Sequence, residues 1–156
     1  MDYLLAVDLG VRTGLAFFSY EPSLIWYRSH NYGSKARLRK HIYSILKDIP
    51  PSSELLIEGG GDIASVWKKG ADKCGIAYEQ IYAEDWRPDI LKPSSIKNAE
   101  LAKAAADRAA QIAIKLYNAP KKYTIPNTDA SEAILIGLWG LFKRGAVQSI
   151  PPEIKG

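Results

Sequence analysis

The sequence contains a single cysteine, Cys74, in 156 residues. One cysteine excludes an intramolecular disulfide and any zinc site built from several thiolates. It fits a reducing compartment, so we expect a cytoplasmic protein. Long apolar runs are also missing. The longest covers residues 133–142, about half of the roughly 20 residues that a membrane-spanning helix needs. The N-terminus has no basic region ahead of an apolar run, so we expect neither a signal peptide nor a membrane span.

Neither sign of charge dominates the chain. Lys and Arg number 21 and Asp and Glu 17, which gives a formal charge of +4 and a pI of about 9.1. This mild excess excludes a histone-like basic tail. The length predicts one domain and is too short for the two lobes of a kinase or an actin-like ATPase. We expect a single domain over residues 1–150 and a C-terminal tail over 151–156.

The pattern of apolar and turn residues predicts an α/β fold. Residues 3–7 form a short, continuous apolar run that ends at Asp8, which is typical of a central strand buried on both faces. The order of the predicted elements favours a mixed five-stranded sheet flanked by helices. Strands are predicted over 3–7, 15–19, 24–30, 55–57 and 76–83, and helices over 35–47, 62–73, 96–116 and 128–143.

Four acidic residues stand at the ends of predicted elements. Asp8 and Glu58 each follow an apolar strand, where a carboxylate is costly unless something compensates it or it lies at the rim of the sheet. Asp129 and Glu132 are three residues apart in the first turn of the last long helix, so they share one face. The rest of that helix is apolar and must lie on the sheet. We therefore expect the four carboxylates to converge.

Converging carboxylates repel one another unless cations neutralise them. Oxygen ligands without nearby His or Cys suit Mg²⁺ or Mn²⁺, and a site with two such ions performs phosphoryl transfer. Taken singly, Asp8 is also explained as a turn residue, and Asp129 and Glu132 as first-turn acids favoured by the helix dipole. The four together favour a site.

Three segments of the sequence resemble motifs of the RuvC-like Holliday junction resolvases of the RNase H superfamily. They are LAVDLGVRTGLA at 5–16, LIE at 56–58 and DASEA at 129–133. The resemblance implies an RNase H-like fold and a nucleoid-associated homodimer that cuts four-way DNA junctions with two Mg²⁺ or Mn²⁺ ions. It implies Asp8, Glu58, Asp129 and Glu132 as metal ligands. The chain departs from the family at Glu132, where Asp is usual, and in the short helix over 62–73.

The remaining charges favour a nucleic-acid partner. With the four site acids set aside, the basic excess rises to eight, enough to attract a phosphate backbone. Trp86 is a candidate for stacking on a junction base, with burial in the core as its alternative. For Lys97 and Lys103 the alternative is an ordinary place on the solvated surface of a helix. The predicted phosphate contacts are Arg12, Arg87, Lys97 and Lys103.

Two other functions remain open. One is an RNA or RNA–DNA hybrid nuclease of the YqgF-like branch, which Asp8 and Arg12 also fit. The other is a non-catalytic RNase H-like module that binds branched DNA. His30 and His41 show no partner pattern, and the basic residues over 35–41 are expected to form a solvated helix face.

Overall fold

The computed structural model describes residues 1–117 and 126–156. Five strands form one mixed sheet in the order β3-β2-β1-β4-β5. The first three strands along the chain are antiparallel neighbours, whereas β4 runs parallel to β1 and β5 parallel to β4. The predicted fold class is therefore confirmed. The strands are β1 (Tyr3–Asp8), β2 (Arg12–Ser19), β3 (Ser23–Asn31), β4 (Ser53–Glu58) and β5 (Ala77–Ile81).

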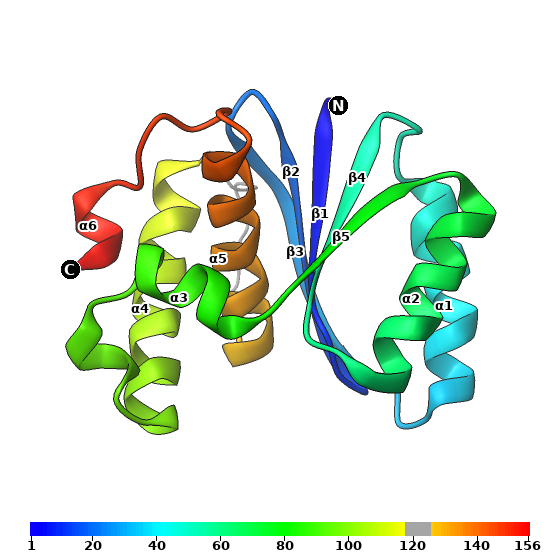
Figure 1. The fold of residues 1–156 in the computed structure, drawn as a ribbon, viewed down its shortest axis with the longest axis horizontal. Coiled ribbons are helices and arrows are strands. Elements are labelled where there is room, and N and C mark those ends of the chain that lie inside the picture. The colour runs from blue at the N-terminus through cyan, green and yellow to red at the C-terminus, as the bar shows by residue number, and fades with distance from the viewer. Residues whose placement is uncertain (118–125) are drawn as a thin grey trace.

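Helices cover both faces of the sheet (Figure 1). Helices α1 (Lys35–Asp48) and α2 (Gly61–Cys74) lie on one face. The other helices lie on the opposite face, with α5 packed between the sheet and α4. They are α3 (Ala83–Ile90), α4 (Ala99–Leu116), α5 (Thr128–Lys143) and α6 (Pro152–Lys155), and a 3₁₀ turn covers Pro93–Ile96.

The central strand divides its side chains between two cores. Leu4 and Ala6 of β1 belong to the core beneath α4 and α5, whereas Leu5 and Val7 belong to the core beneath α1 and α2. Alternation with a period of two is the geometry of any strand. Because both faces are covered, the strand is apolar at every one of these positions. Helix α5 is apolar on nearly all sides for a related reason, since it is enclosed by the sheet and α4.

Several predicted boundaries differ from the structure. The helix expected from residue 96 begins at Ala99, where the Asn98 side chain accepts a hydrogen bond from the Leu101 amide at 2.9 Å. Helix α3 was not predicted, because its eight residues include Pro88 and show no long apolar period. The segment expected as a tail forms α6, and its Ile154 is fully buried. Among the described residues, no helix is both long and apolar enough to cross a bilayer.

Candidate active site

Three elements bring the predicted site residues to one end of the sheet. Strands β1 and β4 pair in parallel with Asp8 opposite Glu58, so both carboxylates leave the sheet at the same edge. Helix α5 begins at that same edge, beside the ends of these strands (Figure 1). Its first turn carries Asp129, and Glu132 follows one turn later. The topology thus joins residues from the beginning, middle and end of the chain.

The close approach of α5 to the sheet depends on Gly14. This residue pairs with Asp8 across β1 and β2. A Cβ atom at Gly14 would collide with the backbone carbonyl of Asp129, so any larger residue would push the helix away. Asn127 fixes the start of the helix. It accepts a hydrogen bond from the Ala130 amide at 3.0 Å and donates one to the Ser29 hydroxyl at 2.7 Å.

Asp8, Glu58 and Glu132 form a cluster of like charges. Burial, together with the charges of Glu132 and Glu58, raises the pKa of Asp8 to about 10. Burial also raises the pKa of Glu58, although a hydrogen bond from Asp8 opposes this effect. The raised pKa favours the protonated form of Asp8, which can donate a hydrogen bond to a neighbouring carboxylate. These carboxyls are therefore strained electrostatically in a way that a divalent cation would relieve.

Asp129 lies beside this cluster and is not hydrogen-bonded to Asp8. Burial raises its pKa, while the charge of Arg12 opposes the rise and that of Glu132 adds to it. The Asp129 carboxylate lies 3.7 Å from the Arg12 guanidinium, and 67% of the Arg12 side chain is exposed. Asp8, Glu58 and Glu132 are thus close neighbours with Asp129 beside them, and their role as metal ligands stays a prediction.

Arg87 is the cation that pairs with Glu132. Its guanidinium donates a hydrogen bond to Glu132 at 2.7 Å, and the two side chains are 30% and 13% exposed. The Arg87 Nε is buried and has no partner among the described residues. Sequence reasoning placed Arg87 on the DNA but missed its contact with Glu132. The two residues are 45 positions apart, so the sequence gave no local signal of the contact.

The predicted role of Trp86 in base stacking is corrected by the structure. Its side chain is fully buried in the core beneath α3, α4 and α5. A nucleobase can stack only on an exposed ring face, so Trp86 acts in packing. Lys97 and Lys103 are exposed, as a phosphate contact requires. The charge of Lys103 also lowers the pKa of Asp129, which places this lysine near the site.

The donor set of this cluster is chemically suited to Mg²⁺ or Mn²⁺, because it consists of carboxylate oxygens alone. The raised pKa values of Asp8 and Glu58 also favour a cation, because their negative charges are not fully compensated. Within residues 1–117 and 126–156, however, no group of three or more such side chains is already opened around a common metal position. The carboxyls instead bond to one another and to Arg87. Holding a cation therefore requires these contacts to be exchanged.

No family model matches this sequence, and no curated protein matches it. Solved structures do. Thermus thermophilus RuvC in complex with a Holliday junction substrate superposes with a TM-score of 0.63 over 93% of this chain and 96% of that one. The chain has the RuvC fold. A second Thermus thermophilus RuvC structure matches with a TM-score of 0.61 over 92% of this chain and 96% of that one. Identity to each RuvC chain is 12%, so the likeness is one of fold.

Proposed function

We propose that this protein is a metal-dependent endonuclease that resolves four-way (Holliday) DNA junctions as a homodimer. One observation carries the proposal: on a RuvC fold, Asp8, Glu58 and Glu132 converge at the sheet edge in a cluster whose charges lack full compensation. A carboxylate cluster kept at such an energetic cost is typical of a functional site. Here its chemistry favours hydrolysis of a phosphodiester.

Asp8, Glu58, Asp129 and Glu132 would hold two Mg²⁺ or Mn²⁺ ions. When bound, such ions supply a hydroxide nucleophile and stabilise the leaving oxygen of an in-line displacement. Asp8 must give up its proton to become a ligand, because its pKa is raised to about 10 in the cluster. Metal binding is therefore expected to release protons. Cleavage would leave a 5′-phosphate and a 3′-hydroxyl.

The DNA backbone would be held by basic residues around the cluster. The side chains concerned are exposed: Arg12, Lys97 and Lys103. The charges of Arg12 and Lys103 oppose the rise in the pKa of Asp129. Arg87 has a double role in this scheme. Its guanidinium neutralises Glu132 before a cation arrives, and its unpartnered Nε is available to a phosphate oxygen once Glu132 becomes a ligand.

Cleavage of a labelled four-way junction with Mg²⁺ or Mn²⁺ tests the proposal, with plain duplex and an RNA–DNA hybrid as parallel substrates. Wild type is compared with Asp8→Asn, which keeps the shape and removes a ligand charge. Asp62→Asn is the matched control, because Asp62 is exposed and pairs with Lys35 at 2.9 Å rather than with the carboxyls of the cluster. We expect paired nicks near the branch point from wild type and the control, and none from Asp8→Asn.

Two results would redirect the proposal. A junction that is bound but left intact with both metals would identify a non-catalytic module for branched DNA. Preferential cutting of the RNA–DNA hybrid would identify a nuclease whose substrate is RNA or an RNA–DNA hybrid.

A further inference from the structure

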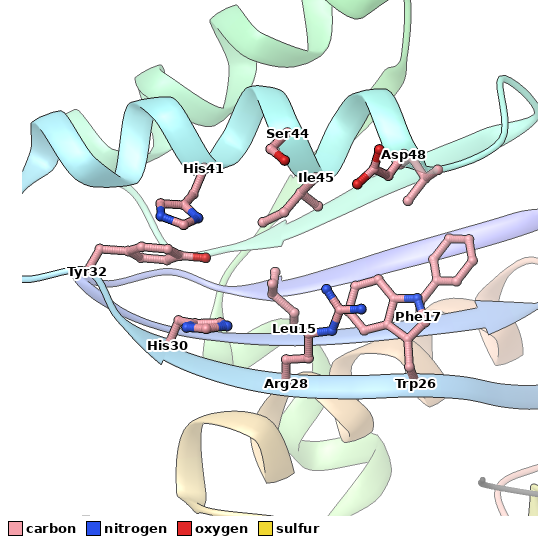
Figure 2. Close-up of a pocket in the computed structure, with 11 residues that line it drawn as sticks. Leu15, Phe17, Trp26, Arg28, His30, Tyr32, His41, Ser44, Ile45 and Asp48 are labelled. Atoms are coloured by element: carbon pink, nitrogen blue, oxygen red, sulfur yellow. The ribbon is translucent and has the colours of Figure 1, made fainter.

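A pocket of about 190 Å³ lies on the face of the sheet opposite to the carboxylate cluster. It opens between helix α1 and strands β2 and β3 (Figure 2). Leu15 and Phe17 form part of its floor and belong to the core beneath α1 and α2. Asp8 follows the parity of Leu4 and Ala6, which face α5. The sheet therefore separates this pocket from the candidate active site.

The walls of the pocket are flat aromatic rings. At one end Trp26 stacks on Phe17 with ring centroids 5.4 Å apart. At the other end Tyr32 lies 4.9 Å from the ring of His41 and 5.5 Å from that of His30. A cavity of about 150 Å³ holds one benzene ring, so this pocket has room for a small heteroaromatic ring system. Because these rings stack on one another, a planar ligand would meet mainly their edges, in the edge-to-face arrangement that aromatic pairs also favour.

The pocket also contains polar groups with hydrogen-bonding capacity to spare. The Tyr32 hydroxyl is buried and lacks a hydrogen-bond partner among the described residues, and Figure 2 shows it directed into the pocket. A buried hydroxyl without a partner is unfavourable, and a polar ligand that accepted its hydrogen bond would remove that cost. Burial raises the pKa of Tyr32, so the phenol stays protonated and able to donate. Ser44 and Asp48 line the same pocket from α1.

Arg28 supplies a cation at this pocket. Its side chain is exposed, and its guanidinium lies 4.3 Å from the centroid of the Trp26 ring, among the other residues that line the pocket (Figure 2). The imidazoles of His30 and His41 lie stacked, 6.4 Å apart, and present their faces to each other. Among the described residues no cluster of His, Cys, Asp or Glu is arranged for a metal. The aromatic lining and the Arg28 guanidinium favour an organic ligand.

The exposed side of α1 adds two further cations at the rim of the pocket. Lys40, Ser44 and Lys47 follow one another at helical spacing and share one face. Ser44 lines the pocket, so the two exposed ammonium groups flank its helix wall. A planar ring with an attached anion would thus find an aromatic lining inside and positive charge outside.

We propose that this pocket binds a nucleobase, with the attached phosphate held at the rim by Lys40 and Lys47. Arg28 and the Tyr32 hydroxyl donate to acceptors on the ring, and the Asp48 carboxylate accepts from ring N–H or amino groups. Guanine offers both edges together, so we expect it to bind best. The base comes either from a free nucleotide or from an unpaired position in a nucleic-acid strand.

The two histidines give a direct test, because they are the only ones in the chain and both line the pocket. Their Cε1–H proton NMR signals are followed while GMP is added to the metal-free protein. We expect both signals to shift and saturate, with a dissociation constant of about 1 mM or tighter. Ribose 5-phosphate, which has no base, should leave them nearly unchanged. Signals that stay unmoved with both GMP and a guanine-containing single strand, or equal shifts with ribose 5-phosphate, would overturn the proposal.

Variants locate the binding groups. Arg28→Gln and Tyr32→Phe are each expected to weaken GMP binding at least fivefold. Lys115→Gln is the control, since it removes the same charge from an exposed position on α4, on the other face of the sheet. Equal GMP affinity in Arg28→Gln and Lys115→Gln would contradict the assignment. Circular dichroism confirms that each variant is folded.

A short single-stranded oligonucleotide containing guanine distinguishes the two sources of the base. Shifts with GMP identify a free-nucleotide site, and shifts with the oligonucleotide alone identify a site for an unpaired base in a strand. Neither measurement involves cleavage or a metal. Failure of the nuclease proposal would therefore leave this result unaffected, and the reverse also holds.

Discussion

Strand β4 carries a glutamate near each end, and the surroundings of the two are opposite. Glu54 accepts hydrogen bonds from Arg144 at 2.8 and 3.0 Å and from the Tyr20 hydroxyl at 3.1 Å. These partners, Arg144 above all, lower its pKa. Glu58, four residues along the strand, faces other carboxyls, and its pKa is raised. The comparison distinguishes a carboxylate that stabilises the fold from one that the fold must tolerate.

Helix α5 shows the same contrast from the other side. Its C-terminus ends at Arg144, which donates to the Gly140 carbonyl at 3.1 Å and to Glu79 at 2.7 Å, a favourable place for a cation. Its N-terminus faces Asp8 and Glu58 with Glu132. The same strand and helix thus form an ion-paired anchor at one end and a charge-strained cluster at the other. Only the strained end would be stabilised by the cations that we propose.

The largest expected effect on cleavage comes from replacing each of the two glutamates, one at a time, by glutamine. Glu58→Gln should lower junction cleavage by at least about 10³-fold, because a lost metal ligand removes several kcal/mol of transition-state stabilisation. Glu54→Gln makes the same chemical change at the anchor and should leave cleavage per folded molecule within about twofold. Single-turnover rates at saturating Mn²⁺ measure both. Similar losses in the two variants would erase the distinction between the two ends.

The stability of the metal-free protein should depend on Asp8 and on pH. An acid whose pKa is raised in the folded state stabilises the fold only while protonated, so its contribution falls as pH rises above the unfolded value. The free energy of unfolding of Asp8→Asn should therefore exceed that of wild type between pH 5 and 9, by about 2–3 kcal/mol near neutral pH. Urea unfolding at several pH values measures the difference.

Mn²⁺ provides the control for that measurement. It should stabilise wild type and have little effect on Asp8→Asn. A pH-independent difference between the two proteins would show that Asp8 is not charge-strained.

Breaking the anchor should cost stability without affecting chemistry. Arg144→Met keeps the apolar stem and leaves Glu54 without its cation, which should cost about 2–3 kcal/mol. The thermal midpoint should fall by about 5–10 °C in a domain of this size. Differential scanning calorimetry measures it, with Lys143→Met as the matched control, since Lys143 pairs with Asp89 at an exposed site. A loss in Lys143→Met as large as in Arg144→Met would contradict the buried-anchor interpretation.

The smallest effect concerns the cation at the strained end. Arg87→Met should raise Mn²⁺ affinity by about tenfold, because it removes a competitor for Glu132. Cleavage should nevertheless fall, since the same guanidinium is expected to serve the phosphate. Electron paramagnetic resonance of free Mn²⁺ reports affinity without activity. Unchanged affinity would mean that Arg87 and the cation do not compete.

Local patterns in the sequence were enough to predict the main elements of the site. The apolar run ending at Asp8 and the apolar helix beginning near Asp129 each follow from burial on both sides. Both placed their acids at element ends, and the parallel pairing of Asp8 with Glu58 fits that expectation. The sheet and its two helical layers followed from the same periodicities.

Features that depend on contacts between distant segments were not predictable. Trp86 and Arg87 are neighbours in α3, yet one is fully buried and the other reaches Glu132. Which way such a short helix turns is decided by the elements it packs against. His30 and His41 likewise come from a strand and a helix, and only the approach of α1 to the sheet brings both rings to Tyr32.

The wide spacing of the cluster along the chain has a consequence for biosynthesis. Asp8 lies in the first strand, whereas Glu132 lies in the last long helix, which docks against Gly14. A growing chain emerges N-terminus first, so the hairpin and β4 can form long before α5 exists. The cluster is complete only after that helix has been made and has docked. Whatever chemistry it performs, an unfinished or partly unfolded chain is unable to perform it.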